Sequence, residues 1–286
     1  MYPGTGRPFG AHCWRRLERR GGASFDLDGA RVASVKASMP DLDGARVAYL
    51  LDPVKLENSE PGYPAPAVRQ RLVGESGISL TRISCEEVQQ GGLSAFTVLC
   101  VPGGFAPHIA ARLGEAGAAA LRAWVHAGGG YVGLCAGAFL GCFLNLLAVN
   151  VRDVDHVGQP SSPCLVRFSA TGQELLGAVA EAVTARYANG PIFTAPAINL
   201  AGESSVRGGN LLTGQVRTLA SFASSCRHAS VEMEGSPAIV GGMHGAGLVL
   251  LVSPHIEDGA GERTHAPFRN LFRLAHAVHE MSLAGG

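Results

Sequence analysis

The chain has 286 residues, of which 47% are hydrophobic and 16% are charged. The 23 Lys and Arg residues balance the 23 Asp and Glu residues, so the formal net charge is zero. This composition is typical of a sheet buried on both faces and excludes a disordered or coiled-coil protein. A neutral chain also lacks the basic surface that nucleic acid or an anionic membrane requires, so we expect neither partner.

The first residues of the chain differ from the rest. Residues 1–40 are rich in Gly and Arg and show little periodic apolar pattern, which predicts a disordered N-terminal tail. Acidic residues are scarce before Asp26, so an organellar transit peptide is the alternative interpretation. The octapeptide DLDGARVA occurs at residues 26–33 and again at 41–48, which we interpret as a local duplication because repeat folds need several copies. We place one domain at residues 41–286.

From Ala45 onward, apolar segments alternate with amphipathic ones. Apolar strands separated by amphipathic helices indicate βαβ units and therefore a parallel sheet. In an open parallel sheet, functional groups collect beyond the C-terminal ends of the strands. We expect strands at residues 46–51, 78–83, 96–101 and 131–134, and helices at 65–74, 85–90, 115–126 and 136–147.

The second half of the chain is less regular. Residues 164–168, 218–223 and 229–233 have the pattern of short strands, for which we expect antiparallel pairing. A strongly apolar strand follows at residues 247–253, and a final helix at about residues 267–281 closes the domain.

Cysteine and histidine usage limits the kinds of site that the chain can carry. The seven cysteines are widely spaced and never arranged as C-x-x-C, which excludes a secreted disulfide scaffold and favours a reducing, cytoplasmic environment. His228 and His244 have no His or Cys at metal-ligand spacing, so we expect no metal. The segment GGGYVG lacks the Lys-Ser/Thr ending of a phosphate-binding loop, so we expect no cofactor.

One apolar run has the length of a transmembrane helix. Residues 131–149 are almost continuously apolar and are long enough by count for a transmembrane helix. Three glycines and Asn145 interrupt the run, and its start has the pattern of a strand followed by a helix. Residues 1–25 also lack the apolar core of a cleavable signal peptide. We therefore expect neither a membrane span nor a cleavable signal.

Residues 133–137 read GLCAG, which has the form glycine-x-nucleophile-x-glycine with Cys135 at its centre. A nucleophile on a strained strand-to-helix turn exposes its side chain, and the turn brings together backbone segments that only glycine tolerates. The thiol would also lie at a helix N-terminus, where unpaired N–H groups favour a thiolate. We expect a partly exposed, nucleophilic Cys135, with Cys100 and Cys142 buried. The alternative is a structural cysteine on a glycine-rich turn.

A cysteine nucleophile needs a base and often a group that orients the base. His255 and Glu257 follow the apolar strand predicted at residues 247–253. Side chains two residues apart on an extended segment share one side, so the acid can hold an imidazole that faces the thiol. The order Cys…His-x-Glu therefore predicts a catalytic triad of Cys135, His255 and Glu257.

A Pro-Gly-Gly turn at residues 102–104 precedes the cysteine turn by one βα unit. Backbone N–H groups of Gly104 or Phe105, together with that of Ala136, could form an oxyanion hole for a reacting carbonyl. Glycine at this turn lets the backbone approach a substrate, so Gly103 is a predicted substrate contact.

The segments VLCVPGGF, GGGYVGLCAGA and VLLVSPHIE, in this order, resemble the class I glutamine amidotransferase-like superfamily. The segments RYANGPIF and GSPAIVGG extend the resemblance to proteins that carry the biotin-protein ligase N-terminal domain, over roughly residues 45–277. The resemblance implies a flavodoxin-like three-layer α/β sandwich with a mostly parallel central sheet and a Cys-His-Glu triad. It also places Tyr187, Asn189 and Gly190 at the pocket, although a purely structural Asn-Gly-Pro turn is the alternative.

Two positions depart from the family pattern. Ile256 stands where the family commonly has proline between the histidine and the acid, and Phe105 follows the glycine turn where an acid is common. No synthetase, ammonia-accepting or biotin-ligase catalytic segment is recognisable, so coupled synthesis would require a separate synthetase or ligase polypeptide.

The sequence therefore predicts a cysteine hydrolase that acts on a small-molecule amide or related acyl substrate. A catalytically silent binding or regulatory domain with the same fold, as in the N-terminal region of biotin-protein ligases, is the alternative. A thiol-based redox or glyoxalase-like protein is less consistent with the sequence, because sister families of that type often have His where this chain has Ala136.

Overall fold

A computed structural model of the chain describes residues 42–51, 65–72, 78–152, 160–177, 181–194, 216–225, 233–258 and 262–284. The tail expected at residues 1–40 lies outside these ranges, so the division into tail and domain stays a prediction. All of the strand expected at residues 229–233 except Met233 lies outside them as well.

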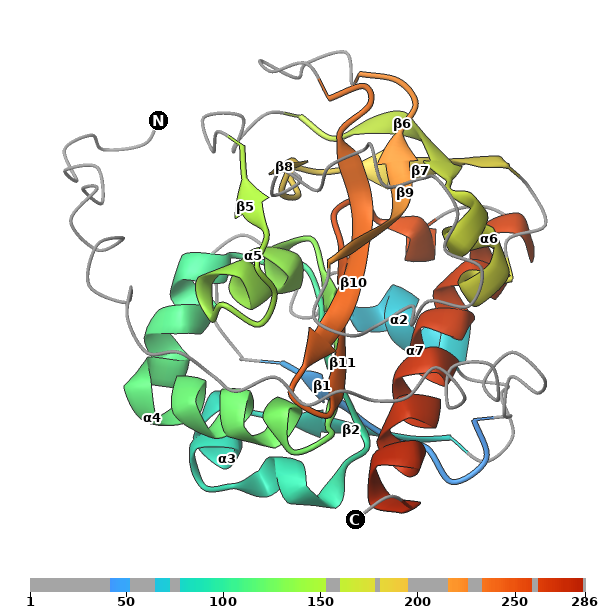
Figure 1. Ribbon diagram of the computed structural model, residues 1–286. Coiled ribbons are helices and arrows are strands. Elements are labelled where there is room, and N and C mark those ends of the chain that lie inside the picture. Colours follow the sequence, from blue (N-terminus) through green and yellow to red (C-terminus); the bar gives the residue numbers. More distant parts are fainter. Residues whose placement is uncertain are drawn as a thin grey trace, which may run out of the picture.

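A nine-stranded sheet in the order β2-β1-β3-β4-β11-β10-β9-β6-β7 forms the centre of the molecule (Figure 1). The pairings from β2 to β11 are parallel, and those from β11 to β7 are antiparallel. Only β10 and β6 run against the others, so seven of the nine strands share one direction, which confirms the mostly parallel sheet. The strands are β1 (Arg46–Leu50), β2 (Ser79–Ile83), β3 (Val98–Val101), β4 (Gly130–Leu134), β6 (Ser162–Phe168), β7 (Ala182–Tyr187), β9 (Arg217–Phe222), β10 (Pro237–His244) and β11 (Gly247–Val252), with β5 (Asn150–Val151) and β8 (Phe193–Thr194) paired separately.

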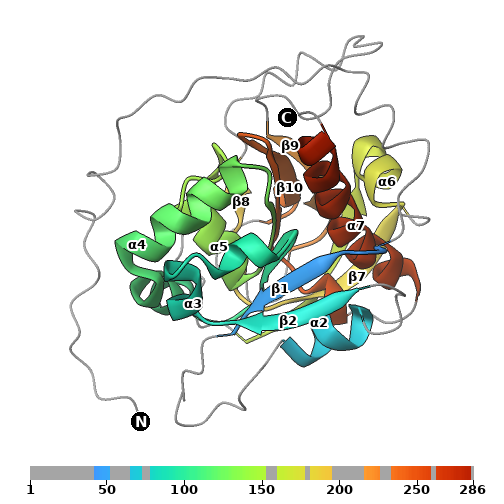
Figure 2. The same cartoon turned by 90° about the horizontal axis from the view of Figure 1, so that it is seen from below.

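Helices cover both faces of the sheet and complete a three-layer sandwich (Figure 2). One outer layer contains α3, α4 and α5, and the opposite layer contains α2, α6 and α7. This arrangement confirms the flavodoxin-like fold class. The helices are α2 (Ala65–Leu72), α3 (Cys85–Gln89), α4 (Ala106–His126), α5 (Ala136–Phe143), α6 (Ala170–Leu176) and α7 (Glu262–Ala284), with short 3-10 turns η1 (Gly92–Ala95) and η3 (Ile256–Asp258).

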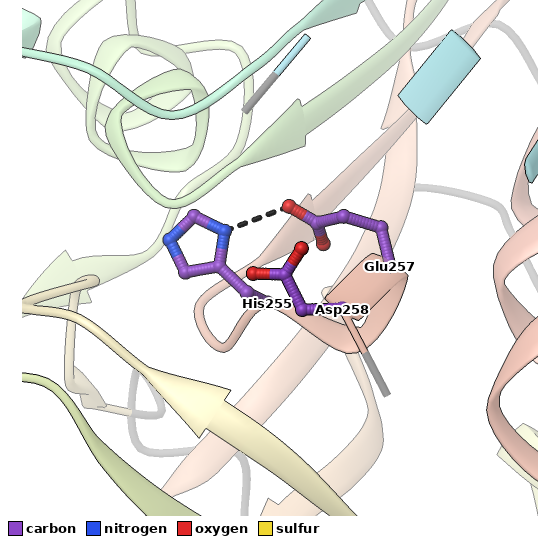
Figure 3. A group of neighbouring side chains, drawn as sticks. All are labelled: His255, Glu257 and Asp258. Carbon is purple, nitrogen blue, oxygen red and sulfur yellow. Dashed lines mark hydrogen bonds and ion pairs between the residues drawn. The ribbon is translucent and has the colours of Figure 1, made fainter. Parts of the chain in front are cut away.

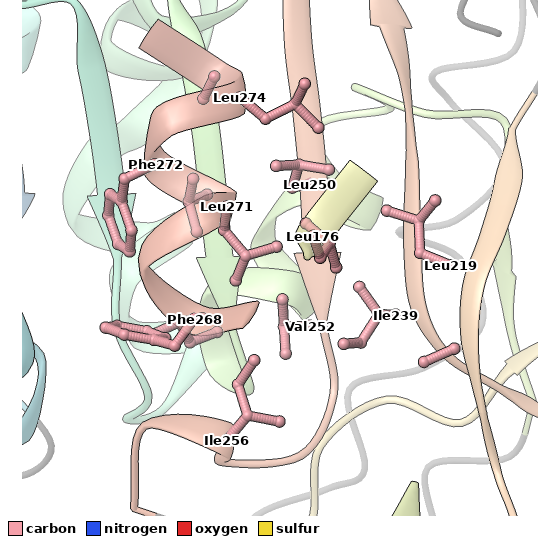
Figure 4. Close-up of a cluster of buried hydrophobic side chains, with 14 of the residues drawn as sticks. Leu176, Leu219, Ile239, Leu250, Val252, Ile256, Phe268, Leu271, Phe272 and Leu274 are labelled. Atoms are coloured by element: carbon pink, nitrogen blue, oxygen red, sulfur yellow. The ribbon is translucent and has the colours of Figure 1, made fainter. Parts of the chain in front are cut away.

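Two apolar cores, one on each face, explain why the central strands read as continuous apolar runs. In β11, Leu248, Leu250 and Val252 belong to the core beneath α7, while Val249 and Leu251 belong to the core on the other face. A strand buried on both faces cannot alternate apolar with polar residues. Figure 4 shows the apolar side of α7 packed against the first of these faces.

The antiparallel half of the sheet curls so that its outermost strand, β7, returns to the segment after β11. From β11 the pairing continues through β10, β9 and β6 to β7. Arg186, near the end of β7, then forms an isolated antiparallel bridge with His255, which follows β11. The outermost strand therefore reaches the segment that leaves the middle of the sheet, and this contact brings two distant parts of the chain to the candidate site.

Several element boundaries differ from those expected. Helix α4 begins at Ala106 rather than at residue 115. The expected helix is its second segment, which follows a kink at Gly114 (φ 56°, ψ −171°). Helix α5 ends at Phe143, shortly before Asn145 takes a left-handed conformation (φ 52°). The apolar run at residues 131–149 is thus a strand followed by a short helix. Among the described residues, no helix is both long and apolar enough to cross a membrane.

Candidate active site

Cys135 occupies the single residue between the end of β4 and the start of α5. Its backbone angles are φ 50° and ψ −102°, a conformation that a residue with a side chain rarely adopts. Such strain persists only where the surroundings hold it in place. Here the Cys135 N–H donates to the carbonyl of Val252 on β11 at 2.8 Å, and the first turn of α5 follows directly. The strand-to-helix turn predicted from GLCAG is therefore present.

The glycine at position 137 is required by close packing between two neighbouring turns. A Cβ atom on Gly137 would lie 2.0 Å from the carbonyl oxygen of Val101, the last residue of β3. The carbonyl of Gly137 also accepts a hydrogen bond from the Tyr131 hydroxyl at 2.7 Å. The cysteine turn and the Pro-Gly-Gly turn after Val101 are thereby held against each other.

We expect Gly137→Ala to lower the free energy of unfolding by about 2 kcal/mol or more, because the new methyl group overlaps backbone that cannot move aside easily. Gly235→Ala is the matched control: its Cβ meets nothing within 4 Å, and its penalty comes only from φ +80°. Backbone strain of that kind costs about 1 kcal/mol. Guanidinium titrations of both variants measure the difference. A smaller loss at Gly137 than at Gly235 would contradict the packing argument.

His255 and Glu257 form a buried pair at the C-terminal end of β11. The Nδ1 atom of His255 lies 2.7 Å from Oε1 of Glu257, and the side chains are 3% and 0% exposed (Figure 3). The expected extended segment is wrong in detail: residues from Ile256 onward form the 3-10 turn η3, and this turn brings the acid to the ring. Isoleucine in place of proline at position 256 therefore does not turn Glu257 away.

His255 carries an unusually basic ring. Burial lowers the pKa of an imidazole, but hydrogen bonds to Cys135 and Glu257 and their charges outweigh burial and raise the pKa of His255 to about 10. The ring is therefore protonated at neutral pH. A hydrogen bond to the Cys135 side chain is among these causes, so the ring lies near the thiol as well as near the acid, and the triad itself stays a prediction.

The Cys135 side chain is more enclosed than expected. Cys135 is only 6% exposed, and its Sγ atom lies 3.4 Å from the carbonyl oxygen of Ala188. The expectation of a partly exposed thiol is therefore wrong, because the turn after β7 covers it. No residue pattern pointed to Ala188, since its contribution is a backbone carbonyl.

The turn after β7 packs tightly against the segment that carries His255. Asn189 has φ 62°, and a Cβ on Gly190 would lie 2.2 Å from the Ser253 carbonyl oxygen. The Tyr187 hydroxyl donates to the carbonyl of Gly190 at 2.8 Å, and the Tyr187 ring packs edge-on against Phe222. The structure therefore places this turn beside the cysteine, and substrate contacts by Tyr187 and Asn189 stay a prediction.

The turn that contains Gly103 and Gly104 lies beside the cysteine turn, because Val101 pairs with Gly133 in neighbouring parallel strands. Phe105 precedes the first residue of α4, and Ala136 is the first residue of α5. Backbone N–H groups at the start of a helix have no partner within that helix. The N–H groups predicted to form an oxyanion hole thus start two adjacent helices, and their role stays a prediction.

Two other cysteines, Cys100 and Cys142, are poor nucleophiles. Cys100 is fully buried, as expected, and burial raises the pKa of its thiol far above its usual range. Cys142 is partly exposed rather than buried, yet burial of its thiol raises its pKa to about 12. A thiol reacts only as its thiolate, so neither competes at neutral pH.

A group of three potential metal ligands overlaps the His-Glu pair. Ligand atoms of His255, Glu257 and Asp258 lie within 4.8 Å of one another. An ion there would compete with the His255–Glu257 hydrogen bond and with the ion pair between Asp258 and Arg186, so we assign no metal site.

A separate open hollow of about 570 Å³ lies beside β6 and β7, and its lining includes Asp258 but not Cys135.

The cysteine after β4 and the buried pair after β11 thus lie at the ends of two neighbouring strands of a flavodoxin-like three-layer sandwich. The structure of PurLQS from Thermotoga maritima is similar, with a TM-score of 0.51, 14% identity, and coverage of 80% of this chain and 97% of that chain. The glutaminase domain of Trypanosoma brucei CTPS with bound acivicin has a TM-score of 0.51 and 16% identity, with 82% and 93% covered. At these identities the similarity shows the fold.

The sequence itself gives a more particular match. Residues 81–159 match the model of the family described as biotin-protein ligase, N terminal, which confirms the resemblance over this part of the chain. The match includes the Pro-Gly-Gly turn and Cys135 and ends before His255 and Glu257. A comparison with curated protein sequences gives no match.

Proposed function

We propose that this protein is a glutamine amidotransferase-like cysteine hydrolase that attacks an amide or related acyl carbonyl. The observation that supports it is the connected series of Cys135, His255 and Glu257 at a strained strand-to-helix turn. Cys135 is the nucleophile, His255 transfers the proton, and Glu257 orients the ring. The fold, shared with a glutaminase domain, supports the same class of reaction.

In this reaction Cys135 attacks as its thiolate beside protonated His255: the sulfur forms a bond to the carbonyl carbon, and the carbonyl electrons move onto oxygen. N–H groups of Gly104, Phe105 and Ala136 stabilise that oxyanion. The intermediate collapses to a thioester as the C–N bond breaks, and protonated His255 gives its proton to the leaving amine. His255 then takes a proton from water, whose oxygen attacks the thioester; the C–S bond breaks and releases the acid and the Cys135 thiolate beside protonated His255.

Substrate contacts are proposed for Gly103, Tyr187 and Asn189, which belong to the two turns beside the cysteine. The substrate is a small-molecule amide or acyl compound, and the reaction needs no metal or cofactor. Use of the released ammonia for synthesis would require a separate synthetase or ligase polypeptide. A screen of glutamine, other carboxamides and small peptides for ammonia or amine release identifies the substrate class.

One observation favours the alternative, a catalytically silent binding or regulatory domain. The Cys135 thiol is nearly enclosed, and its Sγ atom lies 3.4 Å from the carbonyl oxygen of Ala188. If the turn after β7 never moves, the site cannot react. Chemical labelling of the thiol distinguishes an accessible nucleophile from an enclosed one.

We expect iodoacetamide at pH 7.5 to modify Cys135 at least about tenfold faster than Cys100 and Cys142, because burial keeps those two thiols protonated. Competitive alkylation followed by peptide mass spectrometry gives the rate at each cysteine. Cys135→Ser should remove the fast-reacting site and leave the rates at the other cysteines unchanged. Equal or slower labelling of Cys135 would support the silent domain instead.

A further inference from the structure

Two neighbouring carboxylates of one short turn lie close enough to compete for His255. Glu257 holds the ring through Nδ1 at 2.7 Å, and Asp258 belongs to the same 3-10 turn. The three side chains have ligand atoms within 4.8 Å of one another, and Figure 3 shows both carboxylates projecting from this turn near the ring. The orientation of the ring therefore depends on what keeps Asp258 away from it.

Arg186 contacts both ends of the segment from His255 to Asp258. The backbone carbonyl of Arg186 accepts a hydrogen bond from the His255 N–H at 2.7 Å. Its guanidinium Nε donates to Oδ2 of Asp258 at 2.6 Å, and Nη2 lies 2.6 Å from the same oxygen. The two side chains are only 24% and 19% exposed, so solvent screens this ion pair much less than a surface pair.

We propose that Arg186 is a positioning residue of this site, which holds Asp258 aside and leaves Glu257 as the carboxylate that orients His255. This inference rests on the proposed function, because it concerns how the ring is presented to Cys135. The contacts of Arg186 that carry this role are its ion pair with Asp258 and the hydrogen bond that its carbonyl accepts from the His255 N–H. Arg186 acts through Asp258 and through the backbone of His255.

The charges of the four groups explain why the arginine matters. Arg186 and protonated His255 carry two positive charges, and Glu257 and Asp258 carry two negative charges, so the group is neutral. Removal of the guanidinium takes away the cation that pairs with the largely buried carboxylate of Asp258. The protonated ring of His255 is then a neighbouring cation, with ligand atoms within 4.8 Å. Attraction between them would draw the ring from Glu257 and weaken its hydrogen bond to Cys135.

This mechanism predicts a specific rescue. We expect Arg186→Gln to lower the rate of Cys135 alkylation by iodoacetamide by about tenfold, the lower range for residues that orient a reacting ligand. Asp258→Asn should change the rate by less than about threefold, and the double variant should recover to that level, because the competing charge is gone. Arg186→Lys should retain an intermediate rate, since the charge remains but the two-point contact is lost.

Arg167→Gln is the matched control, because Arg167 on β6 forms an exposed ion pair at 3.4 Å with Glu181, the residue before β7, with side chains 60% and 74% exposed. It should leave the alkylation rate unchanged. Thermal melts of all variants identify any that fail to fold. For such a variant, comparison of Asp258→Asn with the double variant still measures whether Arg186 matters once the competing acid is removed.

Two results would overturn the proposal. Unchanged labelling in Arg186→Gln would show that the arginine does not position the ring, and additive losses in the double variant would show that Arg186 does not act through Asp258. Failure of the proposed function looks different: Cys135 of the unmodified protein would then react no faster than Cys100, whatever residue 186 is.

Discussion

His255→Ala is expected to abolish amide hydrolysis, because no other group in the connected series can transfer the proton to the leaving amine. Glu257→Gln should retain more activity, since the base remains and loses only orientation and charge support. The ratio of kcat/KM values for ammonia or amine release measures both effects. We expect a loss of about a thousandfold or more for His255→Ala and a smaller loss for Glu257→Gln.

The structure adds a control that separates catalysis from stability. Glu257 is fully buried, and His255 is the partner of its Oε1 atom, so His255→Ala leaves a buried carboxylate without that partner. Breaking a buried pair in this way costs about 3–5 kcal/mol. The double variant His255→Ala with Glu257→Gln should therefore recover much of the lost Tm while activity stays absent. Recovery of activity in the double variant would exclude His255 as the base.

The positions of the site residues could be predicted where the chemistry lies within a short stretch of sequence. GLCAG contains the strained turn, the glycine needed for packing and the proposed nucleophile within five residues. His255 and Glu257 are also neighbours in sequence, and both follow a strand that its apolar run makes obvious. Their exact conformation was not predictable, because an extended segment and a 3-10 turn both bring residues two apart to one side.

The contacts that enclose the site depend on pairing between distant segments. The bridge between Arg186 and His255 forms only because the antiparallel half of the sheet curls back on itself. Strand β10 links β11 to the rest of the antiparallel half. Its two adjacent glycines interrupt the apolar pattern, so the sequence does not predict a strand there. The carbonyl of Ala188 has no sequence signature, since every residue has one. Burial of Cys135 could therefore not be inferred from local pattern.

The free energy of unfolding should fall as pH rises, because of His255. The pKa of His255 is raised from 6.5 to about 10 in the folded protein. Between these values the folded state binds a proton that the unfolded state has released, so unfolding becomes easier as pH rises. The contribution of His255 is fully present below pH 6.5 and is lost as pH rises through about 10. One proton changes the free energy of unfolding by about 1.4 kcal/mol for each pH unit in that window.

The other described groups whose pKa values are shifted act outside the lower part of this window. Burial lowers the pKa of His244 and His276, so their effect falls below pH 6.5 and has the opposite sign. Cys100 and Cys142 contribute only near and above their ordinary value of 9.0. We therefore expect urea titrations between about pH 6.5 and 8.5 to show a steeper loss of stability in the unmodified protein than in the His255→Ala, Glu257→Gln double variant. Parallel slopes would mean that folding takes up no net proton at this site, contrary to this prediction.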